Sequence, residues 1–371
     1  MEGKVKWVRL GDYIEQCDER NETLQYGLED VMGMTITKEI IPTKANLSGN
    51  DLSKFKIVYP NEFIYNPRTH GKKIGLGFNS SPKPFLISWN NTAFRICDVD
   101  RLLPLYLYIY FNRDEWDRLA CYNSWGSSTE VFSWDELCRM DIPLPSKEDQ
   151  QKVVNVWKTF REIKEQNEAK AAPLMQVCLS YMQFLKHKYP MIELGPYIEE
   201  SNERNRNLKF GEKDLMGVCS EGTFIKSIAN TSGLAFGNYK VVHKGDFAYS
   251  NRINVGSIAL RYDGDCIISP SYAVFRVKPE CEELLQTEFL AIWFRRSEFL
   301  RSTLFFAYGT IKDDFSHREM QRVQIPLPPP EVQQAIVNVY KCANEAKQIA
   351  AEADRLSREV CPALLQHIIH N

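Results

Sequence analysis

The clearest hydrophobic pattern lies in the middle of the chain, where mostly apolar residues recur at alternating three- and four-residue steps. Its members are Val153, Val156, Phe160, Ile163, Asn167, Lys170, Leu174, Val177, Tyr181 and Phe184. This spacing places them on one face of a helix over residues 147–188 and is typical of a coiled-coil seam. Lys170 is the one charged member. Asn167 is expected to fix the register, because a buried polar residue penalises slipped alignments.

A second helical pattern occupies residues 331–370, and most of its seam is alanine. The members are Ile336, Val339, Ala343, Ala346, Ala350, Ala353, Val360 and Leu364. Small side chains allow two helices to approach closely. Pro173 and Pro362 interrupt the two patterns and are expected to kink or restart each helix, since proline removes a backbone donor and clashes with the preceding turn.

The remaining parts, residues 1–145 and 191–328, have a different pattern. Short β-branched and aromatic runs bounded by Gly, Asp and Pro predict strands. Longer apolar runs predict one helix at Leu102–Leu119 and another at Leu284–Arg301. Each part is therefore predicted to be a mixed α/β globule. In the second globule, strands are expected at Val241–Tyr249, Ser257–Tyr262 and Ala273–Lys278.

The chain is an internal duplication. Leu10-Gly-Asp-Tyr-Ile-Glu15 returns 184 residues later as Leu194-Gly-Pro-Tyr-Ile-Glu199, and Ile142-Pro-Leu-Pro145 returns as Ile325-Pro-Leu-Pro328. A register held over this length indicates two copies of one unit, each a globule followed by a helix. Two globules separated by paired helices predict a dumbbell. The expected divisions are 1–145, 146–190, 191–328 and 329–371.

Composition restricts the class of protein. The 371 residues include 44% hydrophobic and 25% charged residues, and the net charge is −2, which excludes a strongly basic, autonomous nucleic-acid binder. The ten cysteines form no CxxC pair and are expected to be reduced and mostly buried. No apolar stretch is long enough to span a bilayer and no signal segment is recognised, so we expect a cytoplasmic chain without a membrane partner.

Motifs for catalysis are absent from the sequence, which has no phosphate-binding Walker loop, no HExxH and no GxSxG. One segment, Ser269-Pro-Ser-Tyr272, resembles the [DNS]PP[YFW] loop of amino-methyltransferases but lacks the second proline. A turn that enters a strand is the alternative interpretation. No metal site and no catalytic residue are expected in this chain.

Two pairs of loops are candidates for contact with DNA. Arg and Asn side chains pair bidentately with guanine and adenine edges, and these residue types cluster at matching places in the two copies: Asn66, Arg68, Lys72 and Lys73, and Asn251, Arg252 and Asn254. A solvated surface turn is the alternative.

The second pair combines an aromatic residue, a glycine and hydroxyl or basic side chains, which suits close approach to a phosphate. Its candidates are Trp125, Ser127, Ser128 and Thr129 in the first copy, and Tyr308, Thr310 and Lys312 in the second. An ordinary turn beside the core is the alternative.

The order of these motifs resembles a known family. In the second copy "LGPYIE" is followed by "KGDFAYS…NVGSIAL" (Lys244–Leu260), "YAVFRV" (Tyr272–Val277) and "AYGTIKDDFS…IPLPPPEVQQAIV" (Ala307–Val337), and a long helix comes next. Twice over, this resembles the specificity subunit of Type I restriction-modification systems. The first copy departs at Tyr59–Gly77, where Asn61 and Glu62 replace the Gly245-Asp246 pair.

The resemblance implies a fold and a function. The fold class is α/β: a tandem duplication of a mixed α/β target recognition domain plus a long helix, the two helices forming an antiparallel coiled-coil stalk. Each globule would read one half of a bipartite, asymmetric target in double-stranded DNA. The helices would set the half-site spacing and dock two methyltransferase subunits, and restriction subunits would join outside them. S-adenosylmethionine, ATP and Mg²⁺ would bind to those partners, with no cofactor on this chain.

Two alternatives belong to other classes. One is a self-contained DNA adenine methyltransferase that uses Ser269–Tyr272, and the other is a helical scaffold that does not read DNA. Exchange of the first globule with that of a homologue is expected to change one half-site only. Lengthening the helix after Ile163 by one heptad is expected to alter the spacer alone.

Overall fold

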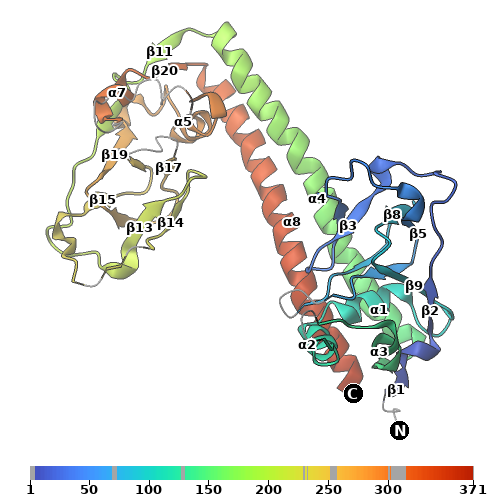
Figure 1. Cartoon of the computed structure of the whole chain (residues 1–371). Helices are drawn as coiled ribbons and strands as arrows, with labels where there is room; N and C mark the ends of the chain where they lie inside the picture. The colour runs from blue at the N-terminus through green and yellow to red at the C-terminus, as the bar shows by residue number, and fades with distance from the viewer. Residues whose placement is uncertain are drawn as a thin grey trace. The chain divides into compact units, whose positions relative to one another are not determined.

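The computed structural model describes residues 5–68, 73–126, 130–228, 230–231, 233–250, 257–299, 301 and 315–370. Contacts divide the chain into two compact units, one made of Met1–Gln166 with Ile349–Asn371 and the other of Asn167–Gln348. Each unit, called unit 1 and unit 2 below, contains one globule and part of each long helix (Figure 1).

The strands of unit 1 are short and mostly apolar, and their longest sheet is antiparallel. Its order is β2 (Ile14–Cys17), β9 (Thr92–Ile96), β6 (Phe63–Tyr65) and β7 (Leu76–Phe78). The hairpin β3 (Met32–Met34) and β4 (Ile40–Pro42) lies next to the pair β5 (Lys56–Val58) and β8 (Phe85–Ile87). One parallel bridge between Val31 and Leu86 joins them. β1 (Lys6–Arg9) pairs with β10 (Asp141–Leu144).

The strands of unit 2 repeat this arrangement. β12 (Ile198–Glu200), β19 (Tyr272–Val277), β16 (Phe247–Ser250) and β17 (Ile258–Leu260) form the antiparallel sheet. The second sheet has the order β14 (Phe224–Lys226), β13 (Leu215–Val218), β18 (Cys266–Ile268) and β15 (Lys240–Val242), with β13 and β18 parallel. β11 (Met191–Glu193) pairs with β20 (Gln324–Pro326).

The described α-helices follow the same order in both copies. In unit 1 α1 is Pro104–Phe111, α2 is Asp114–Tyr122 and α3 is Trp134–Arg139; in unit 2 α5 is Thr287–Phe294 and α7 is His317–Gln321. The long helices are α4 (Lys147–Lys188) and α8 (Pro330–His370). Short 3₁₀ turns complete the globules, at Leu10–Asp12, Leu28–Asp30, Leu52–Lys54, Glu212–Asp214, Phe236–Asn238 and Pro279–Cys281. The prediction of a duplicated mixed α/β globule followed by a long helix is confirmed.

The cores of the two globules share an aromatic pair across matching strands. Phe63 of β6 stacks on Phe94 of β9 with ring centroids 4.9 Å apart, and Phe247 of β16 stacks on Phe275 of β19 at 5.0 Å. All four rings are fully buried. Directly opposed aromatic side chains stabilise antiparallel strands, so the duplicated sequence builds the same sheet twice.

The turn before β6 keeps its shape although the first copy lacks the glycine. Asn61 adopts φ +68° where Gly245 adopts φ +93°, and asparagine is among the residues that tolerate this conformation. The following carboxylate accepts a backbone hydrogen bond in both copies, Glu62 from the Tyr59 N–H at 2.8 Å and Asp246 from the His243 N–H at 2.9 Å. Burial raises the pKa of both carboxyl groups.

The predicted helix Leu102–Leu119 is wrong as a single element, because α1 ends at Phe111 and α2 begins at Asp114. The intervening Asn112 donates from its side chain to the Tyr108 carbonyl 2.8 Å away. Acidic residues in the first turn of α2 favour a new helix start there. In unit 2, α5 likewise covers only part of Leu284–Arg301.

α4 and α8 run antiparallel within each unit (Figure 1). In unit 1 the early residue Val153 of α4 shares a core with the late residue Leu365 of α8, whereas Lys164 further along α4 contacts the earlier Asp354. In unit 2, Met182 near the end of α4 shares a core with Ile336 near the start of α8. The predicted antiparallel pairing is confirmed.

Neither proline ends its helix. α4 continues through Pro173 and α8 through Pro362, so the expected restart is wrong. An interior proline removes one hydrogen bond and strains the preceding turn. Burial of the adjoining faces, seen at Ala171 and Cys361, keeps each helix continuous on both sides of the interruption.

The predicted seam is correct near the start of α4 and wrong near its end. Val153 is buried, but Val177, Tyr181 and Phe184 are 60%, 36% and 50% exposed. In this part of α4 each buried residue lies one position after a predicted seam residue. The buried residues are Ala171 after Lys170, Cys178 after Val177, Met182 after Tyr181 and Leu185 after Phe184.

In α8 the fully buried residues are Cys361 and Leu365, whereas the predicted Val360 is exposed and the predicted Leu364 packs against the core only partly buried. The reason is that the helix ends pack on the globules. The buried residues near each end belong to a globule's core and not to a strict 3.5-residue seam.

None of the ten cysteines forms a disulfide. Cys178, Cys266 and Cys361 are buried, while Cys97 and Cys342 are exposed and the others are half-buried, so the expectation that most are buried is wrong. In the part of the chain that the structure describes, no helix is both long and apolar enough to cross a membrane.

Candidate nucleic-acid interface

Two loops that the sequence singled out separately meet in unit 1. The backbone of Trp125 exchanges hydrogen bonds with Val131, with N···O distances of 3.1 and 3.0 Å. Arg68 forms an antiparallel bridge to the same Val131, and the Phe132 N–H donates to the Pro67 carbonyl 2.7 Å away. The loop after β6 and the loop after α2 therefore lie side by side, joined through the segment that precedes α3.

Asn66 and Arg68 differ in their contacts and in their exposure to solvent. The Asn66 carboxamide oxygen accepts the Arg68 N–H at 3.0 Å, and the Asn66 N–H donates to the Gly75 carbonyl at 2.8 Å. Asn66 is half-buried and shapes the turn, whereas Arg68 is exposed. The guanidinium of Arg68 is thus the group of this pair that is presented for contact with a base edge or a phosphate.

Two exposed aromatic side chains lie at the end of α2 and in the loop after it, which meets the Arg68 loop at Val131. Trp125 is 70% exposed, and Tyr122 at the end of α2 is 80% exposed. Large aromatic rings at such exposure are unusual unless they meet a partner. Tyr122 was not among the sequence candidates; its signal is an aromatic residue three positions before Trp125, at a helix end.

The aromatic pair beneath these loops is repeated in the two copies. Tyr65 at the end of β6 packs edge-on against Phe132, with centroids 6.2 Å apart, and burial raises the pKa of Tyr65. Tyr249 and Phe315 repeat the pair in unit 2 at 5.7 Å. The two copies therefore share this aromatic support, although the segments that follow Tyr65 and Tyr249 differ in sequence.

Lys73 does not join Arg68 and Trp125. Its ammonium group lies 3.6 Å from the Asp114 carboxylate at the start of α2. There it lines a cavity of about 400 Å³ together with Lys38 and Arg113. The structure thus divides the first predicted cluster into a part beside Trp125 and a part on the cavity wall.

The other candidates lie outside the residues that the structure describes. They are Lys72, Ser127, Ser128 and Thr129 in the first copy, and Asn251, Arg252, Asn254, Tyr308, Thr310 and Lys312 in the second. Their assignment to DNA contact stays a prediction.

The methyltransferase-like segment forms a turn. The Tyr272 N–H donates to the Ser269 carbonyl at 3.1 Å, the hydroxyls of Ser269 and Ser271 are 3.0 Å apart, and β19 begins at Tyr272. This is the geometry of a turn that enters a strand. Among the described residues, no three His, Cys, Asp or Glu side chains gather as a metal site would require.

Comparison with known proteins matches part of the chain to a family model and the whole chain to a known fold. Residues 185–342 match the family model described as the Type I restriction modification DNA specificity domain. The chain is similar in fold to the S subunit of a Type-I restriction-modification system from M. genitalium, with 13% sequence identity, a TM-score of 0.63 and coverage of 99% of this chain and 97% of that chain. No curated protein sequence matches the chain significantly.

Two further solved structures show weaker likeness. The HsdS subunit from Thermoanaerobacter tengcongensis is 18% identical, with a TM-score of 0.41 and coverage of 100% of this chain and 97% of that chain. A chain in a structure on complex assembly and conformational transition of the type I R-M system is 17% identical, with a TM-score of 0.46 and 98% of each chain covered.

Proposed function

With residues 185–342 belonging to the Type I restriction modification DNA specificity domain, we propose that this chain selects the DNA sequence on which a Type I restriction-modification complex acts. The first globule repeats the element order of the second. Each globule then reads one half of a bipartite target, and because the loops of the two copies differ in sequence, the two half-sites differ.

The observation that carries the proposal in unit 1 is the meeting of two loops at Val131. It presents the Arg68 guanidinium and the Trp125 ring from neighbouring segments of one surface. Arginine reads guanine in the major groove or holds a phosphate, and an exposed aromatic ring packs on the sugar or a base. Arg68 is the residue of this surface that we assign to DNA contact first.

The chain's near-neutral charge fits a division of labour. Affinity for DNA that comes from release of counterions requires many cations near phosphates, and the net charge here is −2. We assign much of the electrostatic affinity for the duplex to partner subunits. Methyl transfer from S-adenosylmethionine and ATP-driven, Mg²⁺-dependent cleavage also belong to those partners, the methyltransferase and restriction subunits.

An exposed apolar stripe on α4 supports docking of a methyltransferase subunit. Val177, Tyr181 and Phe184 follow one another at helical spacing and are 60%, 36% and 50% exposed. Apolar side chains in a row on one helix face mark a surface that a partner covers. In this proposal each copy docks one methyltransferase subunit, and the helices set the spacing of the half-sites.

Modified-base sequencing tests the function directly. DNA from a host that expresses the methyltransferase subunits with this chain should carry N6-methyladenine in one bipartite motif, and the motif should disappear when the chain is deleted. Methylation that does not depend on the chain would refute the proposal. S-adenosylmethionine binding by the isolated chain, measured by calorimetry, would favour the alternative of a self-contained methyltransferase.

A further inference from the structure

The tip of the β3–β4 hairpin in unit 1 contains a residue in an unfavourable backbone conformation. Lys38 has φ +63°, in the left-handed region that side chains avoid, and its side chain is buried. The equivalent position in unit 2 is Gly222, with φ +69°, which is the usual residue for such a turn. The first copy thus has a buried lysine at a position where a glycine would adopt the same backbone conformation with less strain.

Lys38 anchors the hairpin tip to the helices of its own globule. Its ammonium group lies 2.6 Å from the Asp117 carboxylate on α2. Both side chains are buried, with exposed fractions of 4% and 5%. The Tyr108 hydroxyl of α1 donates to the Lys38 carbonyl at 2.8 Å. Side chain and backbone of one residue are therefore both held.

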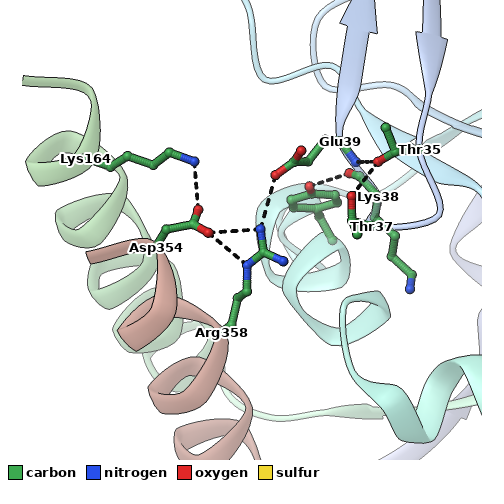
Figure 2. Close-up of polar contacts among 8 residues, drawn as sticks. Thr35, Thr37, Lys38, Glu39, Lys164, Asp354 and Arg358 are labelled. Carbon is green, nitrogen blue, oxygen red and sulfur yellow. Dashed lines mark hydrogen bonds and ion pairs between the residues drawn. The ribbon is translucent and has the colours of Figure 1, made fainter. Parts of the chain in front are cut away.

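The neighbouring residue extends the contact to the long helices, as Figure 2 shows. The Glu39 carboxylate lies 3.3 Å from the guanidinium of Arg358 on α8. Arg358 also pairs with Asp354 one turn earlier, at 3.0 Å, and Asp354 accepts the ammonium group of Lys164 on α4 at 2.8 Å. One chain of charges thus joins the hairpin tip to α8 and then to α4.

These contacts give the globule a second point of attachment to the helix pair. The first point is the apolar core that includes Val153 of α4 and Leu365 of α8. Lys164 lies eleven residues after Val153, and Asp354 lies eleven residues before Leu365. At 1.5 Å per residue the two points are about 16 Å apart along the helices. Two separated points prevent a globule from pivoting about one.

We propose that the hairpin tip Thr35–Glu39 is a strut that fixes the orientation of the first globule on the helix pair, with Glu39 and Arg358 as positioning residues. The inference rests on the proposed function, because its consequence is fidelity to the spacing between half-sites. A globule that pivots reaches half-sites at neighbouring separations, whereas one held at two points accepts a single separation.

Unit 2 attaches its hairpin in another way. The Gly222 carbonyl accepts a hydrogen bond from Arg295, which also bonds to the Tyr340 hydroxyl of α8. Tyr340 lies one helical turn from Ile336, which belongs to the apolar core. The hairpin contact and the apolar contact on α8 are therefore close together along the helix. Between the described residues of the hairpin turn 219–223 and α8 there is no ion pair. The long strut is a property of the first copy.

Charge reversal tests the strut, in the full chain assembled with its methyltransferase subunits. Methylation is measured on DNA with the two half-sites at the native separation and at one base pair more or less. Arg358→Glu and Glu39→Arg should each raise the ratio of off-spacing to native methylation by about threefold to fivefold, the range of a surface ion pair. The double variant E39R/R358E re-forms the pair between the hairpin and α8 but places a carboxylate one turn from Asp354, so it should bring the ratio part of the way back to wild type.

Arg355→Glu is the matched control, because Arg355 lies on the same helix and its ion pairs among the described residues are with Glu352 and Glu359 of α8 itself. It should leave the ratio unchanged. If R358E behaves like R355E while wild type methylates a bipartite site, the inference is overturned and the proposed function stands. If wild type shows no bipartite site, the proposed function fails instead.

Hydrogen exchange provides a readout that does not depend on DNA. The Lys38 N–H donates to the Thr35 carbonyl, and the Thr35 N–H donates to the Glu39 carbonyl, both at 3.0 Å. Exchange of these amides should accelerate severalfold in R358E and not in R355E. Equal exchange in both variants would overturn the strut whatever the DNA result.

Discussion

At the scale of single residues, Lys38 shows how strain and burial balance. Left-handed backbone costs a non-glycine residue about 1–2 kcal/mol, so replacement by glycine removes that cost. It also leaves the Asp117 carboxylate buried without its cation, which costs about 3–5 kcal/mol. The loss of the buried ion pair is the larger of the two effects, so the replacement should destabilise the fold.

We therefore expect Lys38→Gly to lower the free energy of unfolding by about 2–3 kcal/mol, measured by urea titration. The double variant K38G/D117N should lose less than K38G, because the buried charge is gone. A stable K38G would show that Asp117 does not need its partner.

His243 gives unit 2 a pH dependence that unit 1 lacks at the same position. Its ring nitrogens lie 2.9 Å from the Glu203 carboxylate and 3.0 Å from that of Asp265, and the hydrogen bond to Glu203, with that to Asp265, raises the pKa of His243. In the first copy the hydroxyl of Tyr59 donates to Glu19 at 2.7 Å, a contact that raises the pKa of Tyr59 to about 12.

A raised histidine pKa stabilises the fold below the unfolded value of about 6.5, and that stabilisation is lost as pH rises through the folded value. The melting temperature of wild type should therefore fall from pH 6 to pH 8 more than that of His243→Tyr, which copies the residue of the first globule. Parallel pH profiles for the two proteins would contradict the assignment.

At the scale of elements, the displaced seam of α4 separates two faces of one helix. Met182 and Leu185 pack into the core of unit 2, and Tyr181 and Phe184 are left exposed. Because the exposed pair contributes little to the core, its replacement should leave stability unchanged and weaken docking alone.

We expect Y181S/F184S to weaken binding of the methyltransferase subunit by about tenfold, the loss of roughly 1.4 kcal/mol. Copurification and titration calorimetry measure it. Leu179→Ser is the control, since Leu179 is 40% exposed on the other side of the same helix. Equal loss in both variants would point to helix destabilisation in place of docking.

The antiparallel pairing also dictates how a helix can be lengthened. An insertion in α4 alone shifts Lys164 against Asp354, so both helices must be extended. One heptad after Gln166 together with one after Gln348, at the border between the units, adds about 10 Å. At 3.4 Å per base pair the spacer should grow by about three base pairs, with both half-sites intact.

Modified-base sequencing of the resulting motif measures this. A change in half-site sequence, or an unchanged spacer, would show that the helices do not set the separation.

At the scale of the whole molecule, the two units differ in loops and share their frames. Exchange of residues 1–145 for the globule of a homologue should therefore change one half-site and leave the other. Residues of α8 that pack on the first globule, such as Cys361 and Leu365, must be kept compatible. Unchanged methylation sites would favour the scaffold, and a change in both half-sites would show that the globules do not read independently.

The duplication, the mixed α/β class and the two long helices can be predicted from the sequence, because they depend on patterns that recur along the chain. It also indicated Trp125 and Arg68, since exposed aromatic and basic residues beside a glycine or a turn are local signals. The retained turn at Asn61 was less evident, because it depends on which residues tolerate a positive φ.

Which residues contact one another depends on the folded arrangement and cannot be predicted from local patterns. Arg68 and Trp125 come together through Val131, which no local pattern specifies. Near the helix ends, contact with the globules' cores decides which helix face is buried, and the heptad pattern does not. Phe184 is therefore exposed and Leu185 is buried. The buried pair of Lys38 and Asp117 joins residues 79 positions apart. Sequence periodicity reports the face of an isolated helix or strand, whereas burial at a junction depends on what another part of the chain places against it.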